Sequence, residues 1–389
     1  MPLFKRRRRT SDPRRELRLY QALTARLESE LTDSLELLHS YYEGRLVHLR
    51  GRIIGDDDES RSRSTAQIIG HCAKLGLHAH VSGDPEYAHI KLSVKRTPRP
   101  RRRWLYPVFG LLTLLTVLWA GGMHVGIDLL ADPGSWLRGL PFALTLLAIL
   151  GCHELGHYFT AKRYGVAVTP PLFLPFPNPL IGTLGAVIQM RSPVPSRKAL
   201  FDIGIAGPLS GVVVAIPVIL IGLSLSTTIP GPAPEPFLSF SSPALIRIIG
   251  EDLWINLPPL YHLLRLLAIG APRAGEILVL HPVAFAGWLG LFVTALNLVP
   301  VGQLDGGHVV YSGLRRLYKP FSYVMVPLIL LLAVFWPGWA VWGIVLFFVS
   351  RKRPAPLDDI TPLPRGRRLA AWGALLLFLL CLTPVPALI

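Results

Sequence analysis

Long apolar segments alternate with short polar ones from residue 104 to the end of the chain. Apolar runs approaching 20 residues are typical of membrane-spanning helices. The pattern predicts seven of them, at 104–120, 140–160, 200–225, 282–299, 321–336, 339–350 and 369–388. The fifth and sixth runs meet at Pro337-Gly338 and are short for full spans, so they could form a tilted hairpin or a re-entrant pair. We therefore expect a polytopic α-helical membrane protein with about six to seven transmembrane helices.

The first 103 residues show a mixed pattern instead. Helical periodicity covers residues 16–38 and 64–77, whereas residues 46–54, 77–83 and 86–94 alternate like strands. A small α+β soluble domain is the fold that this pattern predicts. We divide the chain into this domain with a basic juxtamembrane arm (1–103), a membrane-embedded core (104–350), and a basic loop with a C-terminal transmembrane helix (351–389).

Composition and charge agree with a membrane protein. Hydrophobic residues make up 51% of the chain, which excludes an ordinary soluble enzyme. Of the formal net charge of +16, more than half lies in residues 1–103, which hold 22 Lys and Arg against 13 Asp and Glu. Lys and Arg also follow the second, fourth and sixth runs, so all basic clusters fall on one side of the membrane. We expect a multi-pass membrane protein with a cytosolic N-terminus.

The same basic clusters predict contacts with anionic lipids, above all at Lys95–Arg103 next to the first run. Nucleic-acid binding is the alternative for such a cluster, but no motif for it accompanies the charge, and we expect no nucleic-acid partner.

Three polar residues interrupt the second apolar run. His153 and His157 lie one helical turn apart and project from one face, which suits two imidazoles on one metal ion. Glu154 lies about 100° around the helix and can reach a water bound there. A charged side chain at mid-membrane costs roughly 2.5–3.5 kcal/mol or more, so the cluster needs a metal, water or a partner. The alternative is a coincidental or purely structural polar cluster.

The end of the fourth run carries the next unusual residues, in NLVPVGQLDGGH at 297–308. Pro300 should break the helix and leave Asp305 beside the membrane, where it is a natural third ligand. His308 competes for that role, although we expect it outside the ligand set. Asn297 could satisfy a helix end or hold the substrate backbone. The second and fourth runs both pass from the outer to the inner face. The residues after the fourth run can therefore meet those of the HELGH motif at 153–157 at one depth.

This pair of motifs resembles the two signatures of the site-2 protease family of intramembrane zinc metalloproteases. The wording of the second motif, together with GTLGAVI between the motifs, is most similar to the branch found in cyanobacteria, other bacteria and chloroplasts. With this resemblance, we expect the protein in a bacterial cytoplasmic membrane. The resemblance covers about residues 105–350. It implies that His153, His157 and Asp305 bind one Zn2+ ion per chain and that Glu154 is the catalytic acid and base.

Five prolines between residues 170 and 179 exclude a helix in the segment between the motifs, and residues 182–190 could form an extended strand. The resemblance implies a re-entrant β-hairpin here; an ordinary cytosolic loop is the alternative. We hypothesise that its open edge binds an unwound substrate segment. The candidate substrate-binding residues are Gly182, Gly185, Ala186, Val187, Ile188, Gln189 and Asn297.

Other residues receive less specific predictions. Gly204, Gly207 and Gly211 in the third run should let a helix pack closely beside the catalytic one, and Asp202 should have a capping or electrostatic role. We expect Cys152 to be a packing residue rather than a ligand. Four histidines of the N-terminal domain could form a second metal site, but we favour solvent-facing strand positions: His71, His78, His80 and His89.

The resulting hypothesis is an intramembrane zinc metalloprotease. It would hydrolyse peptide bonds in or near the transmembrane segments of single-span membrane proteins, as in regulated intramembrane proteolysis. A non-catalytic membrane chaperone or a metal carrier is the alternative.

Overall fold

The computed structural model describes residues 13–43, 46–95, 103–128, 131–231, 243–248, 251–271, 273, 275–351 and 354–388. Most of the predicted lipid-binding arm, residues 96–102, lies outside the described residues. The chain forms two compact units. Unit 1 comprises Met1–Pro100, Ser192–Leu200 and Ala355–Pro364, and unit 2 comprises the remaining residues.

Unit 1 contains an antiparallel four-stranded sheet with strand order β1-β2-β4-β3. Its elements are α1 (Pro13–Glu30), β1 (Leu35–Glu43), β2 (Leu46–Ile53), α2 (Asp58–Lys74), β3 (Leu77–Asp84) and β4 (Tyr87–Val94). Alternate strand residues, such as Leu49 and Ile90, are fully buried with Leu27 of α1 and Ile68 of α2. Both helices therefore cover one face of the sheet, and the period-two pattern of the sequence decides which face is buried.

Two boundaries in unit 1 differ from the sequence prediction. The periodicity up to residue 38 predicted one helix, but α1 ends at Glu30 and the chain from Leu35 pairs with β2. Pairing across a sheet outweighs local helical propensity there. Helix α2 begins at Asp58 rather than near Ser64, because the Asp57 side chain accepts a hydrogen bond from the Ser60 amide and forms a capping box.

Segments from far along the chain extend this sheet. The Val81 amide in β3 donates to the Leu357 carbonyl at 2.7 Å, and the Asp359 amide donates to the Val81 carbonyl at 3.0 Å. The Leu357 amide in turn donates to the Val194 carbonyl at 2.9 Å. Residues 192–200 and 355–364 thus belong to unit 1 through backbone hydrogen bonds.

Unit 2 is built mainly from helices. They are α3 (Leu105–Met123), the 3-10 helix η2 (Pro133–Gly139), α4 (Leu140–Arg163), α5 (Arg197–Ser224, whose first residues belong to unit 1), α6 (Pro259–Ile269), α7 (Pro282–Leu298), α8 (Asp305–Gly313), α9 (Arg315–Leu332), α10 (Gly338–Ser350) and α11 (Arg365–Cys381). Among the described residues, three helical stretches are long and apolar enough to cross a membrane: Leu105–Met123, Gly134–Arg163 and Arg197–Ser224. Helices α6, α7 and α10 are apolar but shorter.

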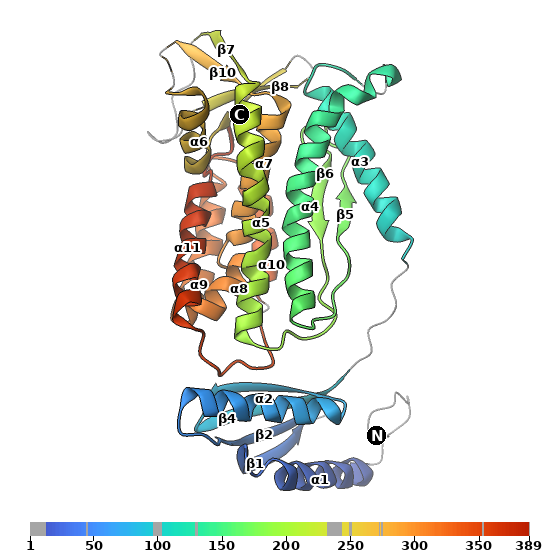
Figure 1. The fold of residues 1–389 in the computed structure, drawn as a ribbon, viewed down its shortest axis with the longest axis vertical. Coiled ribbons are helices and arrows are strands. Elements are labelled where there is room, and N and C mark those ends of the chain that lie inside the picture. The colour runs from blue at the N-terminus through green and yellow to red at the C-terminus, as the bar shows by residue number, and fades with distance from the viewer. Residues whose placement is uncertain are drawn as a thin grey trace. The chain divides into compact units, whose positions relative to one another are not determined.

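A two-stranded sheet, β5 (Leu172–Pro175) and β6 (Thr183–Val187), lies between α3 and α4 (Figure 1). Its turn packs directly on α3. At Gly182, where φ is +72°, an added Cβ would lie 2.5 Å from the Thr116 carbonyl oxygen. Glycine is therefore required both for the backbone conformation and for the close approach.

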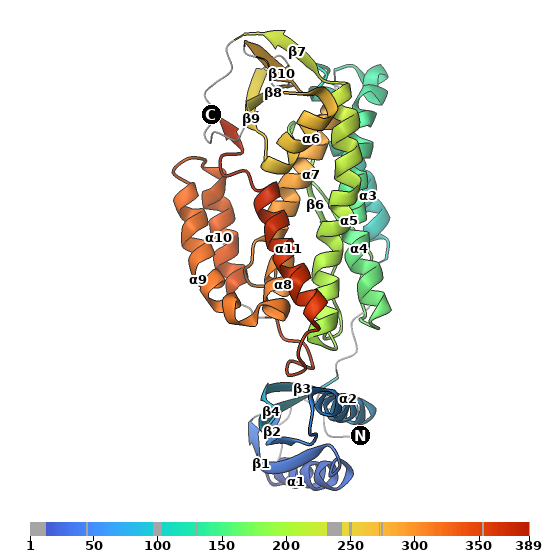
Figure 2. The same ribbon diagram turned by 60° about the vertical axis from the view of Figure 1, so that its left-hand side comes forward.

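A second sheet covers one end of the helices of unit 2 (Figure 2). It has the order β11-β9-β8-β10-β7. The strands are β7 (Thr227–Pro230), β8 (Pro243–Ile248), β9 (Glu251–Asn256), β10 (Glu276–Val279) and β11 (Ala387–Leu388). The sequence prediction had a connecting loop at 226–281 and a last helix reaching residue 388. Instead, α11 ends at Cys381, and the residues after it pair with β9.

Candidate metal centre

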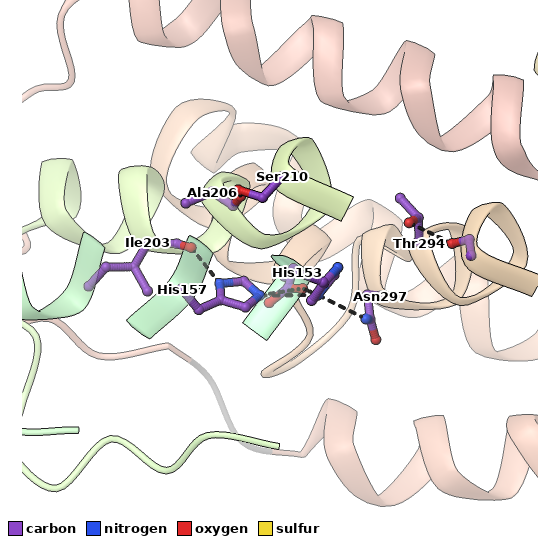
Figure 3. Close-up of polar contacts among 9 residues, drawn as sticks. His153, His157, Ile203, Ala206, Ser210, Thr294 and Asn297 are labelled. Atoms are coloured by element: carbon purple, nitrogen blue, oxygen red, sulfur yellow. Dashed lines mark hydrogen bonds and ion pairs between the residues drawn. The ribbon is translucent and has the colours of Figure 1, made fainter. Parts of the chain in front are cut away.

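Helix α4 carries the two histidines of the HELGH motif. The side chains of His153 and His157 are 5% and 8% exposed, and their Nε2 atoms are 3.3 Å apart. Figure 3 shows both rings pointing to the same region between α4, α5 and α7. The spacing of four residues therefore places both imidazoles on one buried helix face, as predicted.

The turn between α7 and α8 brings Asp305 to the same place. Helix α7 ends at Leu298 just before Pro300, and α8 begins at Asp305 itself. Gly306 allows this tight path, because a Cβ there would lie 1.9 Å from the Leu298 carbonyl oxygen. The Asp305 Oδ2 atom lies 3.1 Å from the Nε2 of His157 and 3.4 Å from that of His153.

These distances allow a direct test of whether the three residues fit a metal ion. Donors bound at about 2.0–2.1 Å to one tetrahedral zinc ion lie about 3.3–3.4 Å from each other. The observed separations of 3.1, 3.3 and 3.4 Å match that spacing. Among the described residues, this is the one group of three or more His, Cys, Asp or Glu whose donor atoms converge. His308 and Cys152 are not in it, and neither are the N-terminal histidines.

Helix α5 supports both imidazoles from behind. The Nδ1 atom of His157 lies 2.7 Å from the Ile203 carbonyl oxygen, which orients the ring so that Nε2 faces the other donors (Figure 3). An added Cβ at Gly207 would lie 2.0 Å from His157 Nε2, and one at Gly211 would lie 3.3 Å from His153 Nδ1. The predicted packing role of these glycines is confirmed. The role of Ile203 was missed, since any residue can offer a carbonyl.

Glu154 lies on α4 next to the first histidine but on a different side of the helix. Its carboxylate is close enough to His157 and Asp305 to interact with their charges, and its backbone hydrogen-bond partner is Ile188. Ile188 directly follows β6. The carboxylate is thus next to the metal donors and next to the segment that we predicted to bind substrate.

Asn297 lies in the last turn of α7. Its Nδ2 atom is 3.2 Å from His153 Nε2, so the amide reaches into the donor cluster (Figure 3). The Asn297 side chain therefore contacts one of the predicted metal donors.

The other predicted substrate-binding residues fall into three groups. Gly185, Ala186 and Val187 form the second half of β6. Gln189 is paired with Thr169 through its amide and its carbonyl, each at 3.0 Å. Gly182 is buried against α3, so the structure does not bring it to the donor cluster.

Comparisons with known proteins agree with this geometry. The family model described as peptidase family M50 matches residues 141–334. The chain is 32% identical over 63% of its length to "Probable zinc metalloprotease EGY1, chloroplastic" of Arabidopsis thaliana and covers 43% of that protein. It is 29% identical over 74% of its length to the EGY1 protein of Oryza sativa subsp. japonica, with 52% of that protein covered. It is 29% identical over 72% of its length to the EGY2 protein of Arabidopsis thaliana, with 48% of that protein covered.

The chain therefore spans about half the length of the curated relatives that it matches. No solved structure gave a significant match. The named relatives are chloroplastic, so the comparisons support a membrane protein but not the expected bacterial cytoplasmic membrane. The matched domain includes the HELGH residues and Asp305, and the chain belongs to peptidase family M50, the site-2 protease family.

Proposed function

We propose that this protein is an intramembrane zinc metalloprotease that cleaves peptide bonds in or near transmembrane segments of single-span membrane proteins. The observation that supports this most is the convergence of His153, His157 and Asp305 at tetrahedral spacing beside Glu154. Two imidazoles and one carboxylate form a donor set found in hydrolytic zinc sites, because they leave a fourth position open for water or substrate.

The residues divide the chemistry between them. Bound to the three donors, zinc would supply Lewis acidity toward the scissile carbonyl and toward water. Glu154 takes a proton from the attacking water and returns it to the leaving amine. Asn297 orients the reacting group with its amide, and Ile203 keeps His157 in the tautomer that presents Nε2.

Substrate binding in this proposal involves the edge of β6 that does not pair with β5. β6 pairs with β5 along one edge, and its C-terminal end passes Glu154 at Ile188. An unwound substrate segment that adds to the other edge would bring its peptide bonds past the Glu154 carboxylate. Strand pairing would also satisfy the backbone groups that lose their hydrogen bonds when a substrate helix unwinds in the membrane.

The membrane arrangement is also part of the proposal. We infer six to seven spans, with α7, the α9–α10 pair and α11 added to the three long helical stretches, and the N-terminus on the basic, inner side. Anionic lipids would bind the basic residues at that side. The basic arm next to α3 makes this side the natural place for such contacts.

Two other functions use some of the same residues. A chaperone would bind membrane proteins without cutting them, and a metal carrier would transport the ion. Neither explains why Glu154 is placed beside the donors without being one of them. Purified protein in liposomes with a single-span peptide separates the three. We expect cleavage by the wild type and none by Glu154→Gln, with the metal content unchanged; full activity of Glu154→Gln would refute the proposal.

A further inference from the structure

A second polar cluster joins three helices of unit 2. Asp202 on α5 accepts hydrogen bonds from the Nε and Nη2 atoms of Arg367 on α11, at 2.7 and 2.9 Å. The hydroxyl of Tyr164, the residue directly after α4, donates to the same carboxylate. A carboxylate held by both arms of a guanidinium has a fixed orientation as well as a strong attraction. We call these three residues the Asp202 clamp.

The clamp is adjacent to the metal centre in the sequence of α5. Asp202 directly precedes Ile203, whose carbonyl holds His157, and lies five residues before Gly207, on which the His157 ring rests. Sliding or rotation of α5 would therefore change the position of its support for that histidine. The clamp ties α5 to the end of the HELGH helix and so opposes this movement.

The third partner, α11, also contacts the helix that begins with Asp305. At Gly313, the last residue of α8, an added Cβ would lie 2.6 Å from the Ala371 Cβ and 3.8 Å from the Arg367 carbonyl oxygen. The first two turns of α11 thus lie against α8 while their arginine holds α5. All helices that carry or support metal donors are linked to this one region.

Helix α11 lies outside the part of the chain that matches the family model, which ends at residue 334. Two other arginines of its first turn, Arg365 and Arg368, are exposed. The Arg367 and Asp202 side chains are more shielded, at 32% and 21% exposed. An ion pair with this degree of shielding and bidentate geometry is stronger than an open surface pair.

We propose that Asp202, Arg367 and Tyr164 are positioning residues for the metal centre, so that the C-terminal helix, outside the matched family domain, is part of its scaffold. They touch neither the donors nor substrate, and they act through the Ile203–His157 hydrogen bond and the α8 contact. This inference rests on the proposed metal site and adds the requirement for α11.

The test measures metal binding directly, using the full-length protein purified in detergent and loaded with Co2+. Cobalt reports its own coordination through visible absorption, independently of proteolysis. We expect Arg367→Gln to weaken Co2+ binding roughly tenfold and to shift the absorption bands. Loss of a direct hydrogen-bond partner of a ligand typically costs roughly 10–100-fold, and Arg367 acts one step further from the donors, so the lower end of that range is expected. Arg367→Lys should recover part of the loss. The matched control is Arg368→Gln, which removes an equal charge from the same turn and should have no effect.

A second measurement tests whether Asp202 and Arg367 act as one unit. Asp202→Asn keeps the size of the side chain, so combining it with Arg367→Gln should give no more loss than the single variants, whereas two unrelated defects would multiply. Wild-type affinity and spectrum in Arg367→Gln would overturn the clamp, and so would an equal loss in Arg368→Gln. If the wild type itself showed no Co2+ spectrum that depends on His157, the proposed metal site would fail instead.

Discussion

Among the described residues, two pairs of histidines bring ring nitrogens within 3.3 Å of each other, one pair in each unit, and the pairs differ in what surrounds them. In unit 2, His153 and His157 present Nε2 atoms 3.3 Å apart, with the Asp305 carboxylate in reach of both. In unit 1, the Nδ1 of His48 lies 2.9 Å from the Nε2 of His89. Both pairs are close enough to suggest a shared ion.

Within the described part of the chain, no third His, Cys, Asp or Glu donor converges on the pair in unit 1. The Glu43 side chain is 76% exposed, and its carboxylate lies 3.6 Å from the other nitrogen of His48, Nε2. The His48 ring is instead stacked between Tyr41 and His89, with ring centroids 4.7 and 5.1 Å away. The comparison teaches that two close imidazoles do not define a metal site. A third, convergent charge and a backbone acceptor that fixes the ring are also needed.

The largest expected difference is in metal content. Replacing His157 with Ala should reduce bound zinc from roughly one ion per chain to almost none, because three protein donors are the minimum for such a site. The matched change His89→Ala should leave the metal content unchanged. Elemental analysis of the purified proteins measures both, and equal losses would show that the two pairs are not different in kind.

The next largest effect is expected when the packing of α5 against His157 is disturbed. Gly207→Ala places a methyl group 2.0 Å from the present position of His157 Nε2, which is far inside van der Waals contact, so α4 and α5 must separate. We expect zinc affinity to fall roughly 10–100-fold. Gly373→Ala on α11 is the control, since an added Cβ there meets nothing within 4 Å. Competition with a chelator of known affinity measures the change; equal affinities of the two variants would contradict the role of Gly207.

How much of this site follows from sequence depends on the kind of atom involved. The imidazoles and the Asp305 carboxylate belong to side chains in recognisable motifs, and the spacing and run directions place them correctly. The Ile203 carbonyl and the Ile188 contact to Glu154 leave no mark in residue identity. Arg367 is visible in the sequence as a charged residue, but its partner Asp202 lies 165 residues away. From the sequence alone, Arg367 therefore indicates only which side of the membrane the helix end lies on.

The fold shows the same limit. The apolar runs locate the helices of unit 2 closely, with α4 and α7 beginning where the runs begin. The sheet at one end of these helices was missed, although residues 243–248 and 251–256 form a hairpin across a short connection. Its edge strand, β11, comes from the end of the chain, and short strands that pair over such distances lack a local signal.

A smaller effect should test the strand beside Glu154. Ile188→Pro removes the backbone amide that contacts the Glu154 carboxylate. A hydrogen bond to a charged group contributes about 1.5–3 kcal/mol, so we expect kcat/KM for a single-span substrate to fall roughly tenfold or more. Ile188→Val changes the side chain and keeps the amide, and it should retain activity. Unchanged cleavage by the proline variant, with its metal intact, would count against this contact and against strand pairing.

The smallest expected effect is the response of unit 1 to acid. Burial lowers the pKa of His80 and His89 below the ordinary value of 6.5, and the nearby cations Lys91 and Arg50 act in the same direction. The unfolded chain then binds more protons than the folded one, so stability is full above that value and decreases as pH falls through the lower folded pKa values. Hydrogen exchange of the β3 and β4 amides, corrected for intrinsic rates, should be faster at pH 5 than at pH 7. Equal corrected rates would contradict this expectation.

X-ray absorption at the zinc edge of the purified Glu154→Gln protein tests the central claim most directly. The three donors predict two imidazole nitrogens and a carboxylate oxygen at about 2.0–2.2 Å with no sulfur, and Asp305→Ala should alter that shell. A sulfur neighbour at about 2.3 Å, which would implicate Cys152, or a shell that Asp305→Ala leaves unchanged, would contradict the assignment.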